Sequence, residues 1–185
     1  MWVDAQGRMM SLTFAGGSGL PPASAATDPA QMVALFKDVC VAGSASAAGV
    51  APAAEARSLT KVPFEMGGKN APVAGVWTRQ GVVVSQADTF LGNKAAQCNA
   101  TFFVDALPAK DKVVEAMTAA LGAPPTNADK AIDKKGRPAK WWDPQWTVTA
   151  PDGSPLTAVI FVAKGNEYMR GDRVQLSLYA AKKGR

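Results

Sequence analysis

The order in which helix-like and strand-like periods follow one another is the feature that most limits the fold of this chain. Two helical stretches come first, three strand-like stretches follow, and then one helix precedes three more strands. Because most strands directly succeed another strand, they are expected to pair antiparallel, with the helices covering one face. The sequence therefore predicts a single α+β domain over residues 27–185, with a mainly antiparallel sheet of about six strands and two to three helices packed on one face.

The three helices are predicted from their caps and their apolar spacing. Thr27 or Asp28 can cap a first helix with Pro29 at its first position, and the apolar face of this helix extends to Cys40. A shorter second helix is predicted over residues 51–60. The third helix is predicted over residues 108–121. An apolar stripe runs along this segment, and Gly122 suits the position directly after a helix.

The strands are predicted from period-two alternation. Their expected ranges are 73–79, 82–86, 98–104, 146–150, 156–163 and 174–180. In the third strand Cys98 lies on one face while Asn99 lies on the other. The last strand alternates apolar residues with Gln175, Ser177 and Tyr179, which predicts one face in contact with water.

Cys40 and Cys98 are the only two thiols, and the chain contains no histidine. Both cysteines fall on faces predicted to be buried, so a disulfide between them would tie the first helix to the sheet. Two buried free thiols are the alternative. A redox role is not favoured, because the sequence has no C-x-x-C motif. A tetrahedral zinc site would need carboxylates in place of histidine. The sequence therefore predicts a structural disulfide, without a metal or another cofactor.

Residues 1–26 are predicted to form a leader or a disordered tail. Arg8 precedes a short apolar stretch over residues 9–15, and Ala23-Ser24-Ala25 has the form of a signal-peptidase site. Together with the paired cysteines, this pattern predicts a periplasmic or secreted protein, with a cytoplasmic location as the alternative. No stretch approaches the ~20 apolar residues of a transmembrane helix.

Basic and aromatic residues gather between residues 129 and 146. The candidate ligand-binding residues there are Lys130, Lys134, Lys135, Arg137, Lys140, Trp141 and Trp142. Cations beside aromatic rings can hold phosphate or sulfate and stack a base or a sugar, so this segment is a candidate site for an anionic ligand or nucleic acid. Three aspartates dilute its charge, and the net charge of +5 is only mildly basic. The alternative is a solvated loop that leads into a strand anchored by tryptophan.

The sequence offers few groups for catalysis. Without histidine, the chain lacks the commonest general base and the usual partner of a serine or cysteine nucleophile. The only glutamates are Glu55, Glu65, Glu115 and Glu167, which are scattered over different predicted elements. A hydrolase that uses two carboxylates remains an alternative, although no motif points to one. The sequence therefore favours a protein without enzymatic activity.

Three short motifs resemble small exported proteins of alphaproteobacteria that have no assigned activity. They are Phe36-Lys37-Asp38-Val39-Cys40 in the first helix, Val76-Trp77 in the first strand and Gln97-Cys98-Asn99-Ala100 at the start of the third. The resemblance covers roughly residues 28–122. It implies a periplasmic or secreted bacterial α+β domain, and it carries over no catalytic residue. We therefore expect a binding or envelope-accessory role, with an anionic ligand or an envelope protein as the partner.

Overall fold

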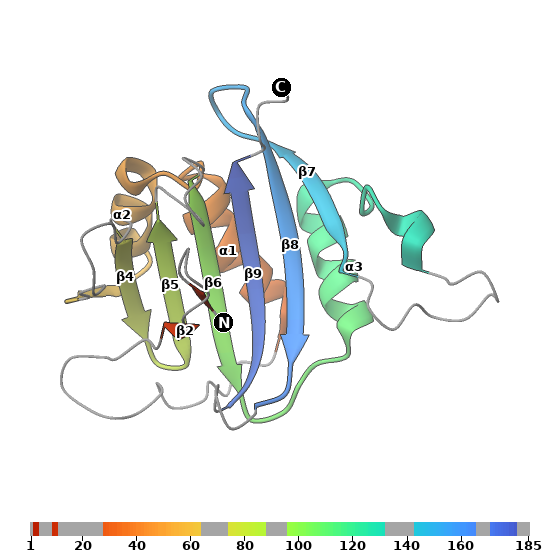
Figure 1. Ribbon diagram of the computed structural model, residues 1–185, viewed down its shortest axis with the longest axis horizontal. Helices are drawn as coiled ribbons and strands as arrows, with labels where there is room; N and C mark the ends of the chain where they lie inside the picture. Colours follow the sequence, from red (N-terminus) through yellow and green to blue (C-terminus); the bar gives the residue numbers. More distant parts are fainter. Residues whose placement is uncertain are drawn as a thin grey trace.

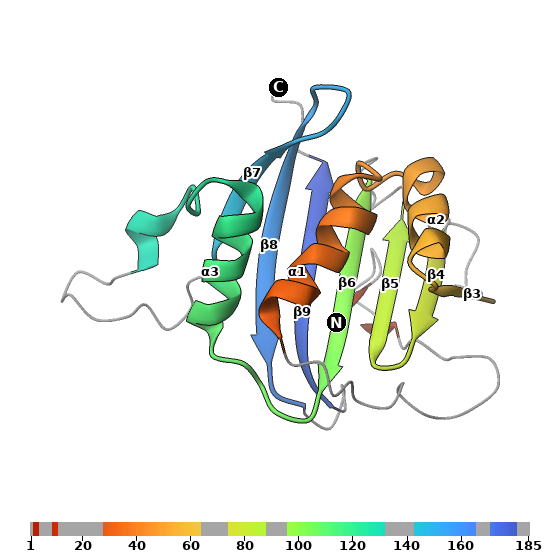
Figure 2. The same cartoon turned by 180° about the vertical axis from the view of Figure 1, so that it is seen from behind.

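The structure, a computed structural model, describes residues 28–63, 74–87, 96–131, 143–165 and 171–180, and the backbone of residues 2–3 and 9–10. It confirms the predicted α+β fold, in which helices cover one face of an antiparallel sheet (Figures 1 and 2). The sheet has seven strands, one more than expected. No helix within these ranges has the length and apolar character needed to cross a membrane.

The strands of the sheet lie in the order β3-β4-β5-β6-β9-β8-β7, and every neighbouring pair is antiparallel. Their bounds are β3 Thr60–Val62, β4 Ala74–Arg79, β5 Val82–Ala87, β6 Gln97–Val104, β7 Gln145–Thr149, β8 Pro155–Ala163 and β9 Asp172–Ala180. The sheet therefore consists of two meanders, one from each half of the chain, which join where β6 pairs with β9.

The helices begin and end largely at the residues that the sequence indicates. α1 spans Pro29–Phe36 and continues as a π-helical turn, η1, over Lys37–Val41. Asp28 caps α1, since its Oδ1 accepts a hydrogen bond from the backbone N–H of Ala30 at 3.0 Å. α3 spans Lys110–Leu121 and ends at Gly122, whose φ of 72° suits glycine. A short 3₁₀ helix, η2, follows at Ala128–Ala131.

The second helix, α2, spans Ala47–Ala56, so the prediction of residues 51–60 is wrong at both ends. It begins earlier because Ser46 caps it, with Ser46 Oγ accepting a hydrogen bond from the backbone N–H of Gly49 at 3.2 Å. Pro52 lies inside the helix rather than at its start. Thr60, the expected last residue of this helix, instead begins β3 and pairs with Thr78 of β4.

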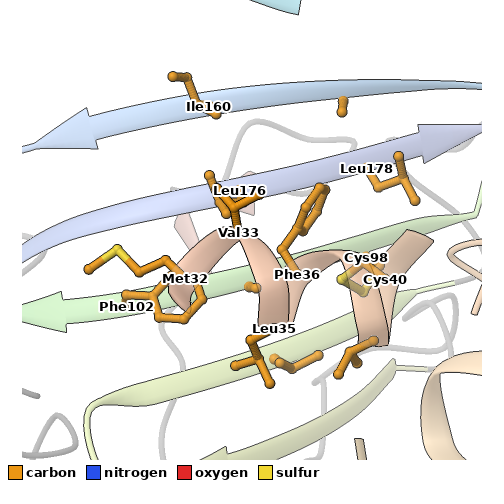
Figure 3. Close-up of a cluster of buried hydrophobic side chains, with 14 of the residues drawn as sticks. Met32, Val33, Leu35, Phe36, Cys40, Cys98, Phe102, Ile160, Leu176 and Leu178 are labelled. Atoms are coloured by element: carbon orange, nitrogen blue, oxygen red, sulfur yellow. A yellow bond between two sulfur atoms is a disulfide. The ribbon is translucent and has the colours of Figure 1, made fainter. Parts of the chain in front are cut away.

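The predicted disulfide between Cys40 and Cys98 is present and joins η1 to β6. Its two Cα atoms lie 5.5 Å apart, and both cysteines are 0% exposed. Figure 3 shows the bridge within the apolar cluster that α1 forms with β6, β8 and β9, close to Phe36 of α1 and Leu178 of β9. The bridge thus reinforces a packing that apolar side chains already hold together.

A separate two-stranded ribbon lies near the N-terminus. β1 (Trp2–Val3) pairs antiparallel with β2 (Met9–Met10). The ribbon lies on the side of the large sheet that faces away from the helices (Figures 1 and 2). The other residues of the 1–26 segment lie outside the described ranges, and its role as a leader or tail stays a prediction.

Candidate functional site

The face of the sheet that points away from the helices, here called the open face, carries polar side chains at its centre. On β6, Cys98 and Ala100 belong to the apolar core beneath the helices. The intervening residues therefore lie on the open face. The antiparallel register extends this polar character to the neighbouring strands. We call the following residues the polar network: Ser85, Gln97, Asn99, Gln175, Ser177 and Tyr179.

Hydrogen bonds connect the members of the polar network within and between strands. Gln97 Nε2 donates to Asn99 Oδ1 at 2.9 Å, and Asn99 Nδ2 donates to Ser85 Oγ at 3.3 Å. On β9, Gln175 Nε2 donates to Ser177 Oγ at 3.0 Å. The amide groups of β6 are therefore held in fixed orientations, which places their remaining hydrogen-bonding atoms at defined positions on the sheet.

The centre of the polar network is buried, although it lies opposite the helices. Gln97, Asn99 and Ser177 are all nearly inaccessible to water. Gln97 Oε1 is buried without a hydrogen-bond partner in the structure. A buried acceptor without a hydrogen bond costs about 1–3 kcal/mol of folding free energy. The prediction of a water-facing surface along the last strand is wrong at Ser177.

The open face is electrostatically close to neutral at its centre. Burial raises the pKa of Tyr179, and hydrogen bonds with Ser177 and Gln97 lower it by less. The phenol therefore stays protonated at neutral pH and remains a hydrogen-bond donor. Arg173, which pairs with Phe103 at one end of β6, has its pKa lowered by burial and raised in part by Asp172. This guanidinium remains positively charged at neutral pH because its ordinary pKa is so high.

The chemistry of the polar network is suited to recognition. The hydroxyl groups of Ser85 and Ser177 each accept a hydrogen bond from an amide. An amide cannot take up a proton at neutral pH, so these contacts do not activate either serine as a nucleophile. Amides, hydroxyls and a neutral phenol can instead donate and accept hydrogen bonds with an uncharged polar partner.

Two of the four glutamates named for the carboxylate alternative lie within the described residues. Glu55 on α2 and Glu115 on α3 are both exposed, and Glu115 accepts a hydrogen bond from Lys112 at 2.8 Å. Glu65 and Glu167 lie outside the described residues. Within the described ranges, no three cysteine, aspartate or glutamate side chains gather in a way that could hold a metal ion.

The predicted basic and aromatic site falls almost entirely outside the described residues. Lys130 lies on η2 and is exposed. The other six candidates, Lys134, Lys135, Arg137, Lys140, Trp141 and Trp142, are outside the described ranges. After this segment, β7 places Trp146 in the apolar core. This tryptophan anchors the strand as the solvated-loop interpretation predicts, whereas the anionic-ligand site itself stays a prediction.

Sequence reasoning missed the polar network as a site. Its signal was present in the alternation of β6 and β9, where amides and hydroxyls recur at every second position. Such a pattern normally indicates a solvated face, and it takes the register between β6 and β9 to bring the two sets together. No protein-family model, curated protein or solved structure matches the chain.

Proposed function

We propose that this protein is an exported bacterial binding domain without enzymatic activity, which acts in the periplasm or outside the cell. The observation that carries the proposal is the buried disulfide between Cys40 and Cys98. Disulfides form and persist in oxidising compartments and are rare in the cytosol. The A-x-A sequence at Ala23–Ala25 agrees with this route, because a signal peptidase would cleave after it.

The polar network supports a binding role at the open face. Its partly exposed members, Ser85, Gln175 and Tyr179, present a hydroxyl, an amide and a neutral phenol beside the buried Gln97, Asn99 and Ser177. Such groups recognise an uncharged, hydrogen-bonding partner, and a segment of an envelope protein fits this chemistry.

Expression with a C-terminal tag in a Gram-negative host, followed by fractionation and intact-mass analysis, tests the proposal. We expect the periplasmic fraction to contain a chain that begins at Ala26 and is alkylated only after reduction. As a matched control, Ala25→Arg should block cleavage and leave the mass of the full chain. A full-length chain in the cytosol, with both thiols alkylated without reductant, would contradict export. Turnover on a broad panel of hydrolase substrates would contradict the non-enzymatic part.

The anionic-ligand alternative has its own test. If the segment around Lys134 and Lys135 binds polyanions, replacing both by alanine should lower the salt concentration that elutes the protein from a heparin column. The matched control replaces Lys110 and Lys112 of α3 by alanine, which removes the same charge elsewhere. An equal shift in the eluting salt concentration for both double variants would show that only net charge matters, and would contradict this alternative.

A further inference from the structure

The two meanders of the sheet are related by an approximate twofold axis. This axis is normal to the sheet and passes between Asn99 of β6 and Ser177 of β9, which pair directly. Each meander runs from an outer strand toward the axis, through β4, β5 and β6 on one side and through β7, β8 and β9 on the other (Figure 1). A half-turn about the axis therefore exchanges β4 with β7, β5 with β8 and β6 with β9.

The register of the strands places matching tryptophans at equivalent positions. When the strand pairs are followed outward from the axis, Trp77 of β4 is exchanged with Trp146 of β7, and a threonine follows each of them in the chain. Both tryptophans lie in the apolar core beneath the helices. Neither buried indole Nε1 has a hydrogen-bond partner among the described residues. The first strand of each meander is thus anchored by the same side chain in the same kind of environment.

The polar residues nearest the axis match as well. The half-turn exchanges Gln97 with Gln175 and Asn99 with Ser177. Gln97 Nε2 donates to Asn99 Oδ1 at 2.9 Å, and Gln175 Nε2 donates to Ser177 Oγ at 3.0 Å. In both cases the glutamine bonds to the second residue after it on its own strand. The same hydrogen bond is therefore made twice, once in each meander.

The elements outside the two meanders follow the same order. α2 precedes β4 and contacts β4 and β5, whereas α3 precedes β7 and contacts β8, the counterpart of β5. On the outer side of β4, Val62 of β3 pairs with Val76. On the outer side of β7, the backbone N–H of Thr126 donates to the carbonyl oxygen of Gln145, the counterpart of Val76, at 2.6 Å. Each half therefore repeats the order helix, edge segment and three strands.

α1 lies outside this repeat and covers the seam between β6 and β9. Figure 3 shows α1 over both strands, with Met32 near Phe102 of β6 and Val33 near Leu176 of β9. The disulfide joins η1, which continues α1, to β6. The seam is thus covered by a single helix, whereas the outer strands are covered by the repeated ones.

We propose that residues 47–104 and 110–180 are two copies of one α-β-β-β unit, and that the edges of β6 and β9 are the interaction surfaces through which two such units associate. The partner that each edge fits is a second unit, which the same chain supplies. A twofold contact uses the same surface on both partners, which is why Asn99 meets its own counterpart, Ser177, at the axis. This arrangement requires neither export nor a ligand, so it stands apart from the proposed function.

Cutting the chain between the two units tests the proposal. One variant of the full chain carries a protease site after the exposed Ala106, between β6 and α3, and a matched control carries it after the exposed Gly153, inside the second unit. Both folded proteins are cut, unfolded in urea without reductant and diluted with all their fragments present. We expect the fragments cut at Ala106 to re-form the complex several-fold more completely, because each contains a whole unit. Size-exclusion chromatography and near-UV circular dichroism measure the recovery. Equal recovery of both complexes, or greater recovery after the cut at Gly153, would overturn the proposal.

A pair of introduced cysteines tests whether the fragments meet at the seam between β6 and β9. Thr101 of β6 pairs with Gln175 of β9, and paired Cα atoms of antiparallel strands lie about 4.5–5.5 Å apart, which suits a disulfide. In the complex re-formed after the cut at Ala106, Thr101→Cys with Gln175→Cys should join the fragments on mild oxidation. In the control, Thr101→Cys with Phe161→Cys, the two positions share a row but lie two strand spacings apart, ~10 Å, and should not crosslink. A crosslink in both folded variants, or in neither, would overturn the proposal.

Discussion

The two faces of the sheet are both buried at their centres, but they are built by different interactions. On β6, Ala100 and Phe102 lie under α1 and belong to the large apolar core, whereas Gln97 and Asn99 lie on the open face and bond to one another. Apolar burial is non-directional and stabilises in proportion to area. Buried amides stabilise only when their hydrogen bonds are made. The helix face therefore supplies most of the stability, and on the open face hydrogen bonds fix the orientation of the buried amides.

Truncating two neighbouring phenylalanines on β6 gives the strongest test of this comparison. Phe102→Ala should lower the free energy of unfolding by about 3–5 kcal/mol, because it leaves a cavity in the large core. Phe103→Ala should cost about 1.5–3 kcal/mol, since its cluster on the open face is small. Urea unfolding of both variants measures the difference. An equal or larger loss for Phe103→Ala would show that the open face carries as much stability as the helix face.

Removing the disulfide tests the covalent contribution to the helix face. The two cysteines are 58 residues apart, and in the chain-entropy model closing so long a loop stabilises the folded state by about 4 kcal/mol. The double variant Cys40→Ala with Cys98→Ala should lose that amount in urea unfolding. The oxidised wild-type protein is the control. A loss below about 1 kcal/mol would mean that packing alone holds η1 on the sheet.

Asn99→Ala tests the polar network on the open face. Asn99 accepts from Gln97 and donates to Ser85, so its truncation leaves buried polar groups without their partners. We expect a loss of about 1–3 kcal/mol in the free energy of unfolding. Ser85→Ala, which removes one end of the same chain of bonds, should cost about 1 kcal/mol. A nearly neutral Asn99→Ala would show that the network contributes nothing to the fold.

The smallest effect is expected from Tyr179 at alkaline pH. Burial raises the pKa of Tyr179 above its ordinary value of 10.0, so the folded protein holds the phenol proton more tightly than the unfolded chain. This stabilisation is complete below pH 10 and is lost as the pH rises through the raised pKa. Tyr179→Phe should therefore lose less stability than wild type between pH 8 and pH 11 in urea unfolding. Parallel pH profiles would show that Tyr179 is not buried in the folded state.

Elements with strong local signals could be predicted from the sequence. The cap at Asp28 and the glycine after α3 both lie within a few residues of the boundaries that they set. In the turn between η1 and α2, Ser44 and Ala45 adopt φ values of 53° and 55° although neither is glycine, and no local pattern indicates this backbone conformation. Tertiary contacts hold this turn, including the hydrogen bond from Gln86 Nε2 to the carbonyl oxygen of Ala45 at 3.3 Å.

The disulfide and the polar network also differ in how far the sequence could predict them. Cys40 and Cys98 could be paired from the sequence, because each lies on an apolar face and no other thiol is available. The three-residue strand β3 is too short for its alternation to be recognised. The polar network needs Asn99 and Ser177 to face each other across strands that are far apart in the chain.

The sequence by itself determined the type of nearly every element, since helix and strand periods, caps and turns depend on residues within one or two turns of each other. It also determined the partners of the disulfide. Only the tertiary structure decided that β6 pairs with β9 and that Ser177 on the open face is buried. These features arise from contacts between distant parts of the chain, whose free energies depend on how whole layers pack rather than on any local pattern.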